Sequence, residues 1–111
     1  MIVKAQGRFL RISPSKVRRV IDLLRGKDVV IAQAILLNLK NRPREYLKKI
    51  LDSAIANAKV KGFRPDQLYV SGIICNAGPI WKRYKAAAFG RATPIRRRTS
   101  HIRIELDLKS T

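Results

Sequence analysis

Residues 78–108 read GPIWKRYKAAAFGRATPIRRRTSHIRIELDL, and this stretch decides most of the fold. In its last part, apolar residues alternate with charged ones: Ile102, Ile104, Leu106 and Leu108 alternate with Arg103, Glu105 and Asp107. A period of two predicts a β-strand with one buried face and one wet face. The earlier part of the stretch has no acidic residue, because none occurs between Asp66 and Glu105.

The acid-free interval is strongly basic. It contains eight cations: Lys82, Arg83, Lys85, Arg91, Arg96, Arg97, Arg98 and Arg103. A run of one sign repels itself unless a polyanion neutralises it. Trp81, Tyr84 and Phe89 lie among these cations, and flat rings beside cations suit base stacking together with phosphate contact. We predict contact with nucleic acid. The alternatives are a solvated loop that only aids solubility and, for Trp81 and Tyr84, cross-strand packing.

The interval also predicts a hairpin. It is bracketed by Pro79 and Pro94, and a turn near Ala86 to Gly90 is favoured because Gly90 can adopt a positive φ. Each arm of a hairpin at about 78–98 has about ten residues, which span on the order of 30 Å when extended. Such a ribbon would protrude from a domain of this size.

Three helices are expected before residue 62. Ser13-Pro14 is typical of a helix start and Gly26 of a stop, Asp28 can cap a second helix to about Leu39, and Pro43 can open a third that Lys61-Gly62 closes. The apolar residues recur at helical spacing. The inward faces predicted for the three helices are Val17, Val20, Ile21 and Leu24; Ala32, Ile35, Leu36 and Leu39; and Leu47, Ile50, Leu51, Ala54, Ile55 and Ala58.

Two further strands are expected. Residues 1–11 offer Ile2, Phe9 and Leu10 for burial in a short strand. After Gly62 the period changes to two, and apolar residues occupy both sets of alternate positions in 68–75, so we expect that strand to be covered on both faces.

Size and charge limit the possible functions. The 111 residues suffice for one small domain with a core, and 25 Lys and Arg against 7 Asp and Glu give a net charge of +18 with a pI near 11.4. This balance indicates an anionic partner. No apolar run is long enough for a membrane span and the first residues do not form a signal peptide, so no membrane partner is expected.

The sequence contains no motif for catalysis or for metal binding. The carboxylates are scattered, a single His and a single Cys exclude paired ligands of either type, and no phosphate loop is present. Cys75 is expected to pack as a small hydrophobe. We therefore predict no catalytic residues, no metal and no cofactor.

Two further groups of residues also suit nucleic acid. Arg96, Arg97 and Arg98 precede Thr99, Ser100 and His101, and guanidinium forks and hydroxyls match phosphate or ribose oxygens. The alternative for His101 is a purely structural role as a neutral polar residue at the start of a strand. The first helix carries cations off its apolar stripe, namely Lys16, Arg18, Arg19 and Arg25.

In this order and spacing, several segments resemble the bacterial ribosomal protein twenty-two family of the large subunit. They are Arg11 to Pro14, Lys16 to Arg18, Arg25 to Lys27, Ser53 to Ala58, Gly78-Pro79, Lys82-Arg83, Gly90 to Ala92 and Arg98 to Ile102. The resemblance covers essentially the whole chain.

The resemblance implies an α+β fold in which three helices pack on a small three-stranded antiparallel sheet with a long protruding β-hairpin. It implies one ribosomal RNA-binding domain over 1–111 that bridges RNA segments during assembly, with contacts from Ser13 as well as the cations and hydroxyls above. The hairpin tip (Ala88, Phe89, Gly90 and Arg91) would line the peptide exit tunnel and meet the nascent peptide. Neighbouring ribosomal proteins would be partners, without homo-oligomers, in a cytoplasmic or organellar ribosome.

At the tip the chain departs from the family pattern. Ala86, Ala87 and Phe89 stand where proline and basic residues are common, which removes cations where the nascent chain is expected. Two rival functions remain: an architectural DNA-binding protein that uses a basic β-ribbon arm, and a nucleic-acid-modifying enzyme. The first usually needs a dimer, and no exposed apolar seam is evident; the second needs a site that the sequence does not show.

Overall fold

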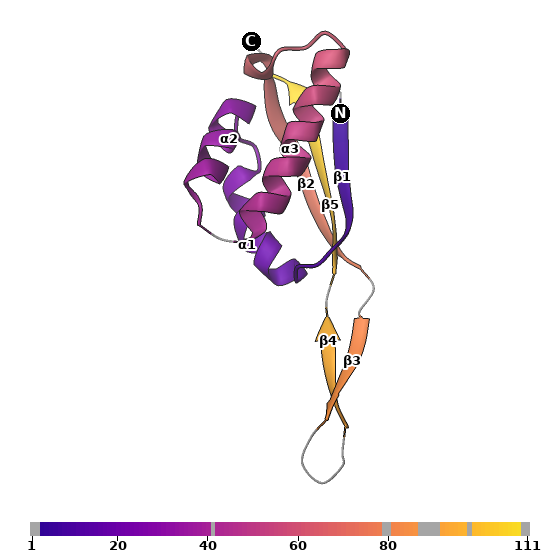
Figure 1. The fold of residues 1–111 in the computed structure, drawn as a ribbon. Helices are drawn as coiled ribbons and strands as arrows, with labels where there is room; N and C mark the ends of the chain where they lie inside the picture. The colour runs from indigo at the N-terminus through magenta and orange to yellow at the C-terminus, as the bar shows by residue number, and fades with distance from the viewer. Residues whose placement is uncertain (1–2, 41, 79–80, 87–91, 98, 110–111) are drawn as a thin grey trace.

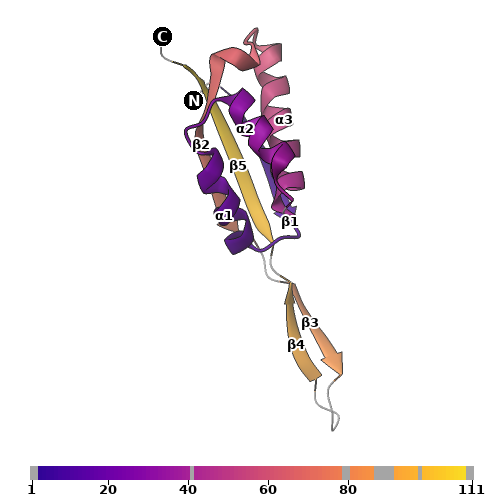
Figure 2. The same ribbon diagram turned by 90° about the vertical axis from the view of Figure 1, so that its left-hand side faces the viewer.

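The computed structural model describes residues 3–40, 42–78, 81–86, 92–97 and 99–109, and for 81–86 and 92–97 it gives the backbone pairing alone. The elements are β1 (Val3–Leu10), α1 (Pro14–Leu24), α2 (Val29–Asn38), α3 (Pro43–Val60), a short 3₁₀ helix (Pro65–Gln67), β2 (Leu68–Ala77), β3 (Trp81–Ala86), β4 (Ala92–Arg97) and β5 (Ser100–Leu108). Within these ranges, three helices cover one face of a three-stranded antiparallel sheet (Figures 1 and 2), which confirms the expected α+β fold.

Helix α1 begins and ends where the sequence predicts. Pro14 is its first residue, the four apolar residues of the predicted stripe are buried, and Gly26 follows with φ of +77°, a left-handed conformation that favours glycine. Ser13 occupies the N-cap position, but its hydroxyl does not cap the helix and lies 3.4 Å from the hydroxyl of Ser15. The predicted start is therefore confirmed, although Ser13 makes no side-chain capping bond.

Helices α2 and α3 follow the predicted stripes. In α2, Ala32 and Leu36 are fully buried, whereas Ile35 and Leu39 are half-buried against the core. In α3, all six residues of the predicted stripe are buried. Asp28 precedes α2 but does not cap it; its carboxylate instead lies 3.2 Å from the Lys109 ammonium.

The outer face of α2 is apolar. Val30, Ile31 and Leu37 are about half exposed, and residues 28–39 contain no Lys or Arg. The expectation that the chain shows no exposed apolar seam is therefore wrong for this helix. The sequence signal was the nearly uninterrupted run of apolar residues, which gives α2 no polar side.

The sheet places the last strand in its centre. Its strand order is β1-β5-β2, so β5 pairs with β1 on one side and with β2 on the other. Ile102, Ile104 and Leu106 are buried as predicted. Leu108 is 41% exposed, which corrects its predicted burial, because the pairing with β1 ends at Val3 opposite Leu106.

An irregularity in β2 decides which of its residues face the helices. The register with β5 shifts between Val70 and Gly72, which is typical of a β-bulge. Leu68 and Val70 face the core before this shift, and Ile73 and Cys75 face it afterwards, so Ile74 is 41% exposed. The prediction that this strand is covered on both faces is wrong: no helix among the described elements covers the second face.

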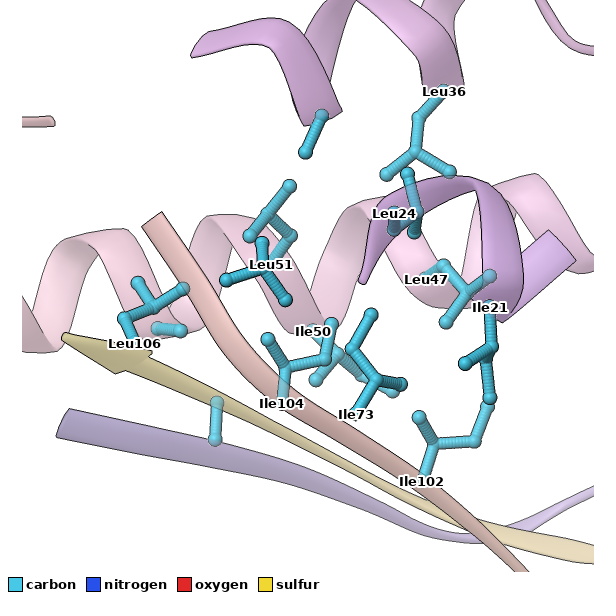
Figure 3. Packing of buried hydrophobic residues seen from close by; sticks show 14 of the residues in the cluster. Ile21, Leu24, Leu36, Leu47, Ile50, Leu51, Ile73, Ile102, Ile104 and Leu106 are labelled. Carbon is cyan, nitrogen blue, oxygen red and sulfur yellow. The ribbon is translucent and has the colours of Figure 1, made fainter. Parts of the chain in front are cut away.

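The core lies between the helices and the sheet. Ile21 and Leu24 from α1, Leu36 from α2 and Leu47, Ile50 and Leu51 from α3 point toward Ile73, Ile102, Ile104 and Leu106 of the strands (Figure 3). Full burial of one such side chain contributes about 1.5–3 kcal/mol relative to exposure. The three helices and the three-stranded sheet, together called the helical domain below, therefore share an interior that does not depend on the basic ribbon.

Helix side chains protect both edges of this sheet. Arg18 donates from Nη2 to the Cys75 carbonyl at 3.0 Å, and Arg25 donates from Nη2 to the Ile73 carbonyl at 3.2 Å. On the other edge, the Asn57 amide donates to the Lys4 carbonyl at 3.1 Å. These bonds satisfy edge carbonyls that would otherwise attract another strand.

Strands β3 and β4 form a separate two-stranded antiparallel ribbon. The ribbon extends beyond the end of the sheet that lies opposite the start of β1 and the end of β5 (Figure 1). The molecule is accordingly elongated, measuring 66 × 25 × 17 Å. The paired arms of the expected hairpin are present. Of the turn expected near Ala86 to Gly90, Ala86 ends β3, and the remaining residues lie outside the described ones.

Candidate nucleic-acid interface

The paired positions of the ribbon bring cations together. Lys82 is opposite Arg96, and Arg83 and Lys85 lie on the same six-residue strand as Lys82. Like charges at directly paired positions destabilise a two-stranded sheet, and an isolated two-stranded ribbon is marginal in water. A bound polyanion would neutralise the repulsion between the paired cations and would add contacts that stabilise the two-stranded ribbon.

Several predicted site residues cannot be compared with the structure. The side chains of Lys82, Arg83, Lys85, Arg96 and Arg97 belong to strands for which only the backbone is described. Arg98 and the tip residues Ala88, Phe89, Gly90 and Arg91 lie outside the described residues. Their roles stay predictions.

The base of the ribbon is closely packed. The Gly78 N–H donates to the Thr99 carbonyl at 2.9 Å, and a Cβ on Gly78 would lie 2.4 Å from Thr99 Oγ1 and 3.3 Å from the His101 ring. Only glycine allows this approach of the two chain segments. This close contact between Gly78 and Thr99 fixes where the chain leaves β2 for the ribbon and where it returns to β5.

The Ser100 hydroxyl is part of the interior. Ser100 has no exposed surface, and its Oγ donates to the Ile12 carbonyl at 2.6 Å. Thr99 is also buried. The Ser100 hydroxyl therefore makes a structural bond that joins the start of β5 to the segment before α1, and its RNA contact stays a prediction that this burial argues against.

His101 fixes a bulge in β1. The register with β5 shifts between Gly7 and Leu10, and Phe9 within this bulge has φ of +54°, an uncommon value for a residue with a side chain. The Phe9 N–H donates to His101 Nδ1 at 3.1 Å, and the two rings meet edge to face at 4.8 Å. An acceptor at Nδ1 places the proton of the neutral ring on Nε2.

The cations of α1 differ in availability. Lys16, Arg18, Arg19 and Arg25 are all exposed. Arg18 and Arg25 each donate a hydrogen bond from one Nη to a β2 carbonyl, and Arg25 also donates to the Asp22 carboxylate at 3.2 Å. Lys16 and Arg19 make no side-chain hydrogen bond within the described chain. Ser13 is half-buried beside this face. A groove of about 370 Å³ runs between α1 and β2 and is lined by both partly engaged guanidinium groups.

Sequence reasoning missed the uncovered face of the sheet. This face carries Lys4, Gln6, Arg8 and Phe9 from β1, His101, Arg103 and Glu105 from β5, and Ile74 and Asn76 from β2. The alternation in β5 already indicated a wet face at Arg103 and Glu105. The bulges of β1 and β2, which bring Phe9 and Ile74 onto this face, left no local signal.

Cys75 is a buried free thiol on the other face of β2. Burial raises the pKa of this thiol, although a hydrogen bond with Ser100 and the positive charge of Arg18 oppose the shift. Nucleophilic chemistry needs the thiolate, so the environment favours the predicted packing role.

In the described part of the chain, no group of three or more His, Cys, Asp or Glu side chains could hold a metal ion. Over the same ranges, no helix has the length and apolarity that crossing a membrane requires.

Comparison with known proteins gives consistent matches. A family model described as "Ribosomal protein L22p/L17e" matches residues 5–107. Proteins named "Large ribosomal subunit protein uL22" are similar along nearly the whole chain. The one from Sulfurihydrogenibium sp. is 50% identical over 99 residues, covering 89% of this chain and 85% of that protein. The one from Desulfatibacillum aliphaticivorans is 40% identical over 107 residues, covering 96% and 99%. The one from Mesoplasma florum is 48% identical over 105 residues, covering 94% of each.

Proposed function

The chain belongs to the ribosomal protein L22p/L17e family, and on that premise we propose that it holds several segments of large-subunit ribosomal RNA together by neutralising their phosphates. Membership makes it a structural constituent of the large subunit in the cytoplasmic ribosome, associated with ribosomal RNA and ribosomal proteins, and not an enzyme.

One observation carries the proposal. A ribbon of two paired strands extends from the sheet of an elongated molecule, and it lies in an interval of the chain without any Asp or Glu. The helical domain already has its own core, so these cations are not needed to fold it. Phosphate contacts by Lys and Arg position a protein on RNA and account for most of the affinity.

Further RNA contacts come from the domain. Lys16 and Arg19 are the strongest candidates on α1, because both are exposed and have no intramolecular bond in the described chain. Arg18 and Arg25 contribute through the N–H groups that the β2 carbonyls leave unused, and Ser13 lies beside them. His101 contributes at the base of the ribbon, together with Arg98 and the ribbon cations.

The hairpin tip is proposed to line the peptide exit tunnel and to meet the nascent peptide. The paired arms support this role, because β3 and β4 extend beyond the sheet and residues 88–91 join them in the sequence. A photo-crosslinker at position 91 in assembled subunits should label the nascent peptide. The same crosslinker at position 64, which lies in the helical domain, should not.

We propose that residues 1–111 act as one RNA-binding domain in a single copy per subunit. The cation-free apolar face of α2 then meets a neighbouring ribosomal protein rather than phosphate. Crosslinks to RNA in assembled subunits should spare residues 28–39.

The salt dependence of RNA binding tests the central step. If about eight phosphates are met, the slope of log K against log[salt] should be about −6 on the single-strand scale and about −7 on the duplex scale. Titration of the full chain against large-subunit RNA from about 50 to about 300 mM salt measures this slope. A flat response rejects the proposal.

The exposed face of α2 suggests a second function beside the place in the ribosome. An architectural DNA-binding protein with a β-ribbon arm usually acts as a dimer, and Val30, Ile31 and Leu37 could form its apolar seam. Gel filtration combined with competition between ribosomal RNA and duplex DNA separates the two functions. A dimer that prefers duplex DNA would favour the alternative.

A further inference from the structure

On the uncovered face of the sheet, we infer that a pocket beside the ribbon base binds one unpaired nucleotide of RNA. This inference rests on the proposed function and deepens it, because it assigns a class of RNA structure to a surface other than the ribbon. The pocket has a volume of about 150 Å³ and is lined by Gln6, Ile74, Asn76, His101, Ile102 and Arg103.

The register of the three strands builds this pocket. Gln6 in β1 and Ile74 in β2 are the two neighbours of Arg103 in β5, and Asn76 is the neighbour of His101. The pairs form two adjacent rows across the sheet. Residues two apart on one strand share a face, so the rows present their side chains on the side away from the helices.

Several polar groups of the pocket have no partner within the part of the chain that the structure describes. The side-chain amides of Gln6 and Asn76 make no hydrogen bond to the described chain, although each can donate and accept. Arg103 Nε is buried without a hydrogen-bond partner, while its Nη2 lies 2.9 Å from Glu105 Oε1. Buried donors of this kind call for an acceptor, and an entering ligand could provide one after a small rotation of the Arg103 side chain.

The His101 ring in the lining of the pocket is held in a fixed position by Phe9. The bond from the Phe9 N–H to His101 Nδ1 and the edge-to-face contact lock these two rings together. The Arg8 guanidinium lies 5.4 Å from the centre of the Phe9 ring. Of these planar groups, the His101 ring and the Arg103 guanidinium line the pocket and give a base flat surfaces to stack on. Stacking on aromatic rings and guanidinium planes is how unpaired RNA bases are bound.

The same groups argue against a site for phosphate alone. The Glu105 carboxylate neutralises Arg103 and repels an anion, whereas two amides that both donate and accept match the edges of a base. The pocket is also smaller than the roughly 300 Å³ at which sites for whole drug-sized ligands begin. It therefore suits one planar group of a larger molecule, and a base within a duplex cannot enter it.

Paired amide substitutions test the assignment without changing the charge. In the full chain, Gln6→Ala with Asn76→Ala should weaken binding of a single-stranded ten-nucleotide RNA about tenfold, as expected for two lost hydrogen bonds. Binding of the blunt duplex of the same sequence should change less than about twofold, and the salt slope should stay the same. The matched control is Gln33→Ala with Asn38→Ala on α2, which should bind both RNAs like the wild type.

A second measurement locates the ligand. Adenosine 5′-monophosphate should shift the backbone amide NMR signals of Gln6, Asn76, His101 and Arg103 in the wild type, and these shifts should disappear in the pocket variant. Unchanged single-strand affinity, equal loss for the duplex, or no shifts at these four residues would overturn the inference. The proposed function fails separately, if the wild-type chain binds RNA without dependence on salt.

Discussion

Replacing Ser100 by Ala tests whether this residue contacts RNA or holds the ribbon base to the domain. The hydroxyl has no exposed surface and donates to the Ile12 carbonyl at 2.6 Å, and Ile12 is itself only 4% exposed. Without the hydroxyl, the buried carbonyl loses a partner that water cannot replace. Leaving such a group unsatisfied costs about 1–3 kcal/mol.

Urea unfolding of the full chain, followed by circular dichroism, measures this cost. Ser100→Ala should lower the free energy of unfolding by about 1–3 kcal/mol, which corresponds to a loss of roughly 4–12 °C in Tm for a domain of this size. Ser53→Ala is the matched control because Ser53 is exposed on α3, and it should be neutral or slightly stabilising.

RNA binding at low temperature, where the variant is folded, completes the test. The structural role predicts that Ser100→Ala binds large-subunit RNA within about twofold of the wild type, since one neutral hydroxyl changes no phosphate contact. A variant as stable as Ser53→Ala that binds RNA several times more weakly would refute the structural reasoning and restore the predicted RNA contact.

Further substitutions probe three separate features of the chain. Gly78→Ala should lower the free energy of unfolding by about 1–3 kcal/mol in thermal unfolding, because its Cβ would lie 2.4 Å from Thr99 Oγ1. Gly72→Ala should lower it less, because its Cβ would meet only the flexible Glu105 side chain at 3.1 Å. Equal effects would contradict the close packing at the ribbon base. Burial raises the pKa of the Cys75 thiol above its ordinary value of 9.0, so the folded state keeps this proton longer than the unfolded state and the free energy of unfolding should fall as pH rises through about 9. Cys75→Ala should lack this part of the fall, and identical pH profiles would show that the thiol is not desolvated. Arg91→Glu should leave the free energy of unfolding within about 0.5 kcal/mol of the wild type but impair assembly of the large subunit, as judged by sedimentation; unfolding of the isolated variant would instead show that the tip packs on its own domain.

The sequence predicted the helices and β5 because their signals are local. Pro14 and Pro43 mark helix starts, and the spacing of apolar residues such as Val17, Ile21 and Leu24 needs only one helix face to be buried. The expected caps were less reliable. Asp28 has a more distant partner in Lys109, which no local pattern could indicate.

Register was the main feature that the sequence could not supply. A bulge of one residue changes which side chains face the core, and the shift after Val70 turned Ile74 outward while keeping Ile73 and Cys75 inside. The predicted burial of Leu108 was wrong for a related reason, because it depends on how far β1 extends along β5.

The interface was predicted in composition but not in detail. Charge alone pointed to the ribbon and to α1, yet Arg18 and Arg25 also bond edge carbonyls of β2, and Ser100 turned inward. The pocket around Gln6, Asn76 and Arg103 combines residues from three strands. It could not be found before the strands were paired.

The most direct test of the account compares two variants of the full chain that lose the same number of charges. One replaces the ribbon cations Lys82, Arg83, Lys85, Arg96 and Arg97 by Gln, and the other replaces Lys40, Lys48, Lys49, Lys59 and Arg64 of the helical domain by Gln. If the ribbon cations meet phosphates, the first variant should show a slope of log K against log[salt] that is shallower by roughly 3.5–4.5, and the second should stay near the wild type. Equal changes in both slopes would show that only the net charge matters and would contradict the account.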